Sequence, residues 1–107
     1  MASGILGQSA PSGTTNTTVY TVPASTLSIV NISVTNRSTS ATVDVRIALS
    51  GTGTPTNAEY IEYEATLPAN GVLERSGIVM ETGKNVVVYC STADTSVSVY
   101  GLEQAAS

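Results

Sequence analysis

The sequence has no tryptophan, no phenylalanine and no histidine, and it has one cysteine in 107 residues. Without histidine there can be no Ser-His-Asp triad, no histidine metal ligand and no imidazole to move protons near pH 7. A single cysteine, Cys90, excludes an internal disulfide and therefore a disulfide-stapled secreted module. Because large aromatic rings are missing, valine, isoleucine and leucine must fill the core.

Charge is also scarce, since charged residues make up 11% of the chain and the net charge is −4. The basic residues are dispersed and too few to follow a phosphate backbone, so we expect no nucleic-acid partner. They are Arg37, Arg46, Arg75 and Lys84. No apolar run approaches a membrane span, and the opening residues lack the basic start and the apolar run of a secretory signal. We expect no membrane partner.

Strand-forming and hydroxyl-bearing residues are abundant, with 16 threonines and 14 serines. Turn signals interrupt the strand-like runs every 8–12 residues or so, which is typical of a sandwich or barrel. No window has apolar residues at helical spacing. The expected strands are 16–22, 27–35, 41–49, 59–67, 72–75, 78–80, 86–91 and 95–102.

Alternation predicts which side chains face the core. In 41–49 the pattern is clearest, and it places four apolar residues inward: Val43, Val45, Ile47 and Leu49. In 27–35 the apolar parity changes between Ile29 and Val30, which predicts a bulge there or burial on both faces. In 59–67 the pattern places Ile61, Tyr63 and Leu67 on the apolar side and Glu62 and Glu64 outward.

We therefore expect an all-β fold, an antiparallel two-sheet β-sandwich of seven to eight strands over residues 16–107. Its connections are too short for parallel crossovers. Either an immunoglobulin-like or a jelly-roll-like topology is compatible with the pattern. Residues 1–15 are small, polar and interrupted by glycine and proline, which predicts a flexible arm that finds order only against a neighbouring molecule.

Few residues offer chemistry. Cys90 follows a strand-like apolar run, so we interpret it as a buried structural thiol and not as a nucleophile. Glu62 and Glu64 lie two residues apart, about 6.7 Å along one strand face; such a pair serves hydrolysis or calcium binding, but a solvated sheet face is favoured. The segment 51–54 resembles a glycine-rich phosphate loop only in its glycines, and a mobile loop is favoured.

The five tyrosines are Tyr20, Tyr60, Tyr63, Tyr89 and Tyr100. They suit a core or an interface better than a sugar-stacking platform, which usually includes tryptophan. Three N-x-S/T triplets, at Asn16, Asn31 and Asn36, are expected by chance in a chain of this composition. We expect no catalytic, metal-binding or cofactor-binding residue, no cofactor and no enzyme activity.

Three blocks carry a family resemblance. The first block is L-G-Q-x-A-P followed by a T-T…Y-T-V-P strand, at residues 6–8, 10–11 and 17–23. The second block is a pair of strands, the first of which ends in N-R, at residues 34–37 and 43–48. The third runs from V-x-V-Y through S-T-A-D to G-x-E (86–89, 91–94 and 96–103). In this order the blocks resemble a family of small virion structural proteins of tailed bacteriophages, notably those of marine cyanobacteria. Val97 and Val99 depart from it, because such chains often have aromatic residues there.

The resemblance implies a capsid decoration or cement protein that binds the major capsid protein and sister subunits by surface burial. It also implies a homo-oligomer, with a trimer favoured, located in the virion and assembled in the host cytoplasm. A tail adaptor, collar or fibre-attachment component is one alternative. A receptor- or glycan-binding β module is the other. No catalytic residues come with the family.

Overall fold

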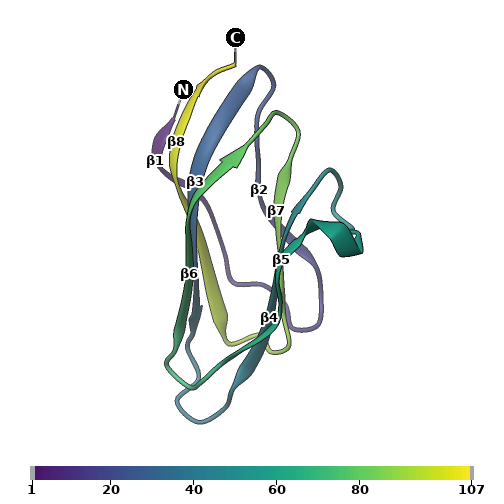
Figure 1. Ribbon diagram of the computed structural model, residues 1–107. Coiled ribbons are helices and arrows are strands. Elements are labelled where there is room, and N and C mark those ends of the chain that lie inside the picture. Colours follow the sequence, from purple (N-terminus) through teal and green to yellow (C-terminus); the bar gives the residue numbers. More distant parts are fainter. Residues whose placement is uncertain (1, 107) are drawn as a thin grey trace.

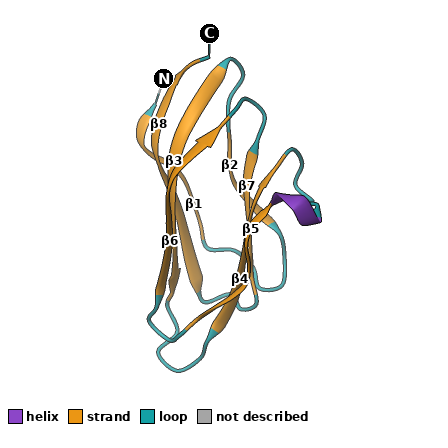
Figure 2. Ribbon diagram, viewed as in Figure 1, coloured by secondary structure: helices purple, strands orange, loops and turns teal. Residues whose placement is uncertain are grey.

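The computed structural model describes residues 2–106, which fold into two antiparallel four-stranded sheets packed face to face (Figures 1 and 2). The first sheet has the order β1-β8-β3-β6 and the second has the order β2-β7-β4-β5. The elements are β1 (Ser3–Ser9), β2 (Thr17–Thr21), β3 (Thr26–Asn36), β4 (Val43–Ser50), the single 3-10 turn η1 (Asn57–Glu59), β5 (Tyr60–Leu67), β6 (Val72–Met80), β7 (Asn85–Cys90) and β8 (Thr95–Ala105).

Four pairings define the topology: β1 with β8, β2 with β7, β3 with β6, and β4 with β5. They correspond to one long hairpin whose tip is the β4–β5 connection, rolled up so that successive pairs lie in alternate sheets. This is the jelly-roll arrangement. The predicted all-β sandwich is confirmed, and the strand order selects the jelly roll from the two topologies that the sequence left open.

The core lies between the sheets and consists mainly of β-branched side chains, which suit a pleated surface. Val43, Val45 and Ile47 are buried as predicted, and Leu49 is half-buried against the same core. Their burial confirms the facing predicted for 41–49. The buried cluster comprises Tyr20, Val22, Val30, Ile32, Val34, Val43, Val45, Ile47, Leu67, Met80, Val86, Val88, Cys90, Val97 and Val99.

Strand β3 alternates without interruption between buried and half-buried residues. The apolar parity changes at Ile29 and Val30 because two polar residues, Thr26 and Ser28, occupy inward positions at the start of the strand. The bulge predicted there is therefore wrong. The irregularity lies in the partner strand β6 around Gly77, which has a φ of 69°, and it merges two expected short strands into one.

Strand β1 is the main difference from the sequence-based expectation. The predicted arm of residues 1–15 contains a strand that pairs with β8 of the same chain, and Leu6 packs against the core. Gly7 passes so close to β2 that an added Cβ would lie 2.3 Å from the carbonyl oxygen of Val19. Glycine has low strand propensity, and β1 contains Gly4 and Gly7, so the sequence pattern did not predict this edge strand.

Asn36 and Arg37 connect three turns at one end of the sandwich. The buried amide nitrogen of Asn36 donates to the carbonyl oxygens of Ala41, 2.9 Å away, and Pro68, 3.1 Å away. Arg37 donates through its guanidinium to the carbonyl oxygen of Ala93 in the β7–β8 turn, at 3.1 Å. These bonds fix the relative positions of turns that belong to different sheets.

Candidate functional site

The outer side of the second sheet carries a cluster built around Arg46. Its guanidinium carbon lies 4.6 Å from the ring centroid of Tyr63 and 4.4 Å from that of Tyr89. Tyr89 is the cross-strand partner of Arg46 on β7. Both contacts are cation–π interactions, which hold the rings in place. We name Arg46, Tyr60, Tyr63 and Tyr89 the tyrosine face.

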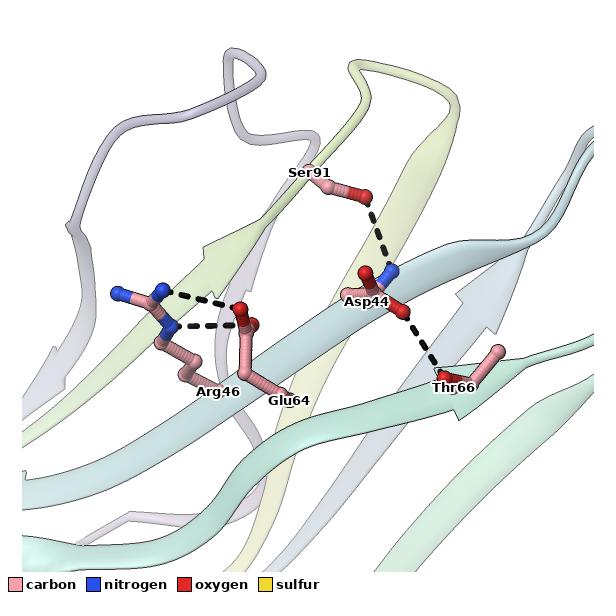
Figure 3. A network of polar contacts seen from close by, with 5 residues as sticks. All are labelled: Asp44, Arg46, Glu64, Thr66 and Ser91. Carbon is pink, nitrogen blue, oxygen red and sulfur yellow. Dashed lines mark hydrogen bonds and ion pairs between the residues drawn. The ribbon is translucent and has the colours of Figure 1, made fainter.

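Glu64 fixes Arg46 through two hydrogen bonds of 3.1 Å, one to Nε and one to Nη2 (Figure 3). This bidentate geometry matches the planar fork of a guanidinium. The hydrogen bond from Arg46 holds the pKa of Glu64 below its usual value, and Glu64 in turn raises the pKa of Arg46. The charge of Arg46 is therefore neutralised within the cluster.

A second set of polar contacts continues along the same face. The hydroxyl of Thr66 donates to a carboxylate oxygen of Asp44 at 2.9 Å, and the Asp44 amide donates to the hydroxyl of Ser91 at 2.9 Å (Figure 3). These bonds link β5, β4 and the start of the β7–β8 turn. The polar groups here bind one another, so they stabilise the sheet face.

The backbone of β5 sets the position of Tyr63. This edge strand has two register shifts against β4, and Glu64 adopts a φ of 54°. The shifts change the facing of two residues from the prediction: Tyr63 is 59% exposed, and Glu62 pairs opposite the inward-facing Ile47. Leu67 is buried, Ile61 packs against the core and Glu64 is exposed, as predicted. Bulges are common on edge strands, and each inserts a residue that breaks the period of two on which the prediction rested.

Glu62 forms an ion pair with Arg75 of β6, and Arg75 also donates to the carbonyl oxygen of Ile61. These contacts bridge the open edge between β5 and β6, which follow one another in the chain but lie in different sheets. A cavity of about 460 Å³ adjoins them. Glu62 and Glu64 thus point to different arginines and not to a common centre, and the arrangement offers no carboxylate pair.

The loop between β4 and β5 is held by Glu59. Its carboxylate accepts hydrogen bonds from the Thr56 amide (2.8 Å), the Ser50 hydroxyl (3.0 Å) and the Gly51 amide (3.2 Å). These bonds lower the pKa of Glu59 to about 2. The segment 51–54, predicted as a mobile loop, is therefore anchored at its base, and it leads into η1, which carries Asn57.

We expect acid to destabilise the protein partly through Glu59. A carboxylate with a lowered pKa in the folded state stabilises that state above its unfolded pKa, about 4.3, and this stabilisation is lost as the pH falls through about 2. Thermal melting from pH 6 to pH 2 will measure the loss. Glu59→Gln should flatten the acid limb of the curve, whereas Glu81→Gln, which alters an exposed residue of the β6–β7 turn, should leave it unchanged. Equal acid limbs in wild type and Glu59→Gln would contradict the assignment.

Beside this loop lies a shallow pocket of about 480 Å³ lined by Asn57, Tyr60 and Tyr63. The two rings meet edge to face, with centroids 5.0 Å apart and planes at 81°. This geometry is one that aromatic pairs favour. Three of the five tyrosines thus gather on one face, an arrangement that sequence reasoning did not predict.

The remaining sequence candidates are structural. Cys90 is fully buried in β7, and burial raises the pKa of its thiol, which confirms the structural interpretation. Tyr20 is buried between the sheets, where its hydroxyl donates to Glu103 at 2.5 Å and lies 2.6 Å from the hydroxyl of Ser28. Burial, together with the bond to Glu103, raises the pKa of Tyr20 to about 12.

The outer side of the first sheet carries an apolar strip. Val79, Ile29 and Leu102 are direct cross-strand neighbours on β6, β3 and β8. Ile5 on β1 is paired with Tyr100 and is therefore a diagonal neighbour of Leu102. Val79 is 63% exposed and Ile5 is 60% exposed. We name these four residues the apolar strip. Large exposed apolar side chains in direct register are typical of a contact surface.

Comparisons with models of protein families, with curated proteins and with solved structures find no match. Among residues 2–106, acidic and cysteine side chains form no group of three or more that could hold a metal ion. The described part of the chain also has no helix of the length and hydropathy needed to cross a membrane. The candidate surfaces are therefore the apolar strip of the first sheet and the tyrosine face of the second.

Proposed function

We propose that this chain is a structural protein of a tailed-phage virion, a decoration or cement protein that binds the capsid shell by burying its first sheet. The resemblance over most of the sequence supports this role. The fold supports it by analogy, because jelly rolls are frequent in viral capsid proteins. The apolar strip is the observation that carries the proposal.

The outer side of the first sheet suits an uncharged contact. Around the strip its outward residues are apolar, hydroxyl-bearing or amide side chains, the amides being Gln8, Asn31 and Gln104. Glu74 is the one charged side chain among those that the pairing registers place outward in residues 2–106. The four strands have 7, 11, 11 and 9 residues, and at about 3.3 Å per residue and about 4.8 Å between strands they make a face of roughly 600 Å². This approaches the 800 Å² or so that each partner buries in a stable interface. We propose the shell protein as the partner.

Val79→Lys is expected to weaken attachment to the shell about tenfold, because a lysine ammonium at the β6 end of the strip would be desolvated without a partner. Co-sedimentation of purified variant protein with shells lacking this chain will measure the bound fraction. Thr39→Lys adds the same charge in the exposed β3–β4 turn and should bind like the wild type. If the two lysine variants bind equally well, the first sheet is not part of the interface with the shell.

Copy number distinguishes the capsid from the tail. Quantitative mass spectrometry of purified virions should find hundreds of copies for a capsid protein, whereas about six, twelve or a few dozen would indicate a tail adaptor, collar or fibre-attachment component. We further propose a trimer, which would match the local threefold positions of a shell, and light scattering of the free protein will test it. A receptor- or glycan-binding role has its own structural support in the pocket lined by Asn57, Tyr60 and Tyr63, the tyrosine pocket.

A further inference from the structure

The pocket formed by Asn57, Tyr60 and Tyr63 has walls suited to a small cyclic ligand. The two rings stand at 81° to one another with centroids 5.0 Å apart, so they form two sides of a corner. The volume, about 480 Å³, is within the 300–1,000 Å³ or so that is usual for ligand pockets. A hexose ring fits such a corner, because its C–H face can pack on an aromatic ring while its hydroxyls point to polar groups.

The pocket is fixed before any ligand binds. Arg46 stacks on Tyr63 at 4.6 Å and is itself held by Glu64. On the other side, Glu59 anchors the loop that carries Asn57 through three hydrogen bonds. An exposed tyrosine that is already held in one position loses less conformational entropy on binding than a free one, which favours affinity.

Polar groups in the pocket are available to a ligand. Within residues 2–106, the side-chain amide of Asn57 and the hydroxyls of Tyr60 and Tyr63 make no hydrogen bond to another residue. An amide and two hydroxyls can both donate and accept, which matches the mixed donors and acceptors of a sugar.

The charges near the pocket exclude ionic ligands. None of its lining residues is charged, and the nearby carboxylate of Glu64 is paired with Arg46. Arg46 already makes the cation–π contact with the Tyr63 ring, so that face of the ring is closed to a quaternary ammonium. An anionic sugar would meet no free cation in the pocket and a chain of net charge −4.

We infer that Asn57, Tyr60 and Tyr63 form a binding site for a neutral hexose unit of an oligosaccharide. The ring of Tyr63 is the stacking platform, Tyr60 is the second wall, and Asn57 orients the sugar through its hydroxyls. The site is on the second sheet, opposite the apolar strip, so a molecule attached by its first sheet would still present it outward (Figure 1). The inference does not depend on the virion role.

The full-length protein should be tested on an array of neutral oligomers of glucose, galactose and N-acetylglucosamine together with anionic oligosaccharides. We expect binding to one or more neutral oligomers. Titration of the protein with the best neutral oligomer, followed by NMR, should shift the side-chain amide signal of Asn57. Binding to anionic members alone, or to none, would overturn the inference.

Substitutions assign the binding to this pocket. Tyr63→Ala should weaken binding about tenfold, since it removes the central aromatic anchor. Tyr63→Phe keeps the ring and should retain most of the affinity. Tyr100→Ala is the matched control, because it removes a half-buried tyrosine from the outer side of the first sheet. Circular dichroism will confirm that each variant is folded. Equal affinity of Tyr63→Ala and Tyr100→Ala would overturn the inference.

Discussion

Gly101→Ala is expected to lower the free energy of unfolding by on the order of 4 kcal/mol. Gly101 lies in β8 between β1 and β3 and has a φ of 149°. A Cβ there would be 2.1 Å from the carbonyl oxygen of Ile29 and 3.0 Å from the Cα of Val30. Both contacts are to backbone, so no side chain can move aside, and the central pairing of the first sheet must shift.

Chemical denaturation followed by circular dichroism will measure this effect. Gly77→Ala is the matched control, because Gly77 also has a positive φ but an added Cβ would meet no atom within 4 Å. Gly77→Ala should lower the free energy of unfolding by about 1 kcal/mol, through backbone strain alone. If the two alanine variants lost equal stability, the positive φ of Gly101 would explain its requirement for glycine. The close approach of the Ile29 and Val30 backbone would then not be needed as an explanation.

Asn36→Ala is expected to cost about 3 kcal/mol of unfolding free energy. The buried amide makes two short donor bonds to the turns at Ala41 and Pro68, and its oxygen accepts from the Ser38 amide at 3.0 Å. Each lost hydrogen bond costs about 1 kcal/mol, so the three lost bonds account for the expected total.

Asn16→Ala provides the control for that substitution. Asn16 also heads an N-x-S/T triplet but is exposed immediately before β2. It should change stability by less than about 0.5 kcal/mol, as is usual for surface positions. Thermal and urea unfolding of both variants will test this. If Asn36→Ala lowered the free energy of unfolding by less than about 1 kcal/mol, the hydrogen bonds of Asn36 would not be needed to hold the three turns in place.

Several residues of the three sequence blocks have structural roles in the sandwich. Gly7 and Gly101 allow close backbone approaches, and Asn36 connects turns of the two sheets. Tyr20 and Glu103 meet inside the sandwich, although they lie in the first and third blocks. These residues of the three blocks therefore maintain the fold, whereas Leu102 of the third block lies in the apolar strip.

Sequence pattern was most reliable where strands are central. Val43, Val45 and Ile47 alternate in β4, which has neighbours on both sides, and their burial could be predicted. The alternation pattern did not predict the facing of side chains in two edge strands, β5 and β1. In β5, bulges turned Tyr63 outward and Glu62 inward, and in β1 the glycines left only Leu6 to indicate a buried face.

The tyrosine face required information that local pattern does not contain. The alternation in 41–49 implies that Arg46 faces outward, but its stacking on Tyr89 depends on the register of β4 against β7. Its contact with Tyr63 depends in addition on the β5 bulge. Strand order is likewise a long-range property, so the sequence could predict a sandwich but could not choose between two topologies.

The position of β8 has a consequence for synthesis on the ribosome. It lies between β1 and β3, so the strand made last is an inner member of the first sheet. Until it emerges, β1 has no partner and one edge of β3 stays open. Long-range pairing of this kind is slow and exposes nascent strands to association with other chains. The first sheet therefore cannot close before β8 is available for pairing.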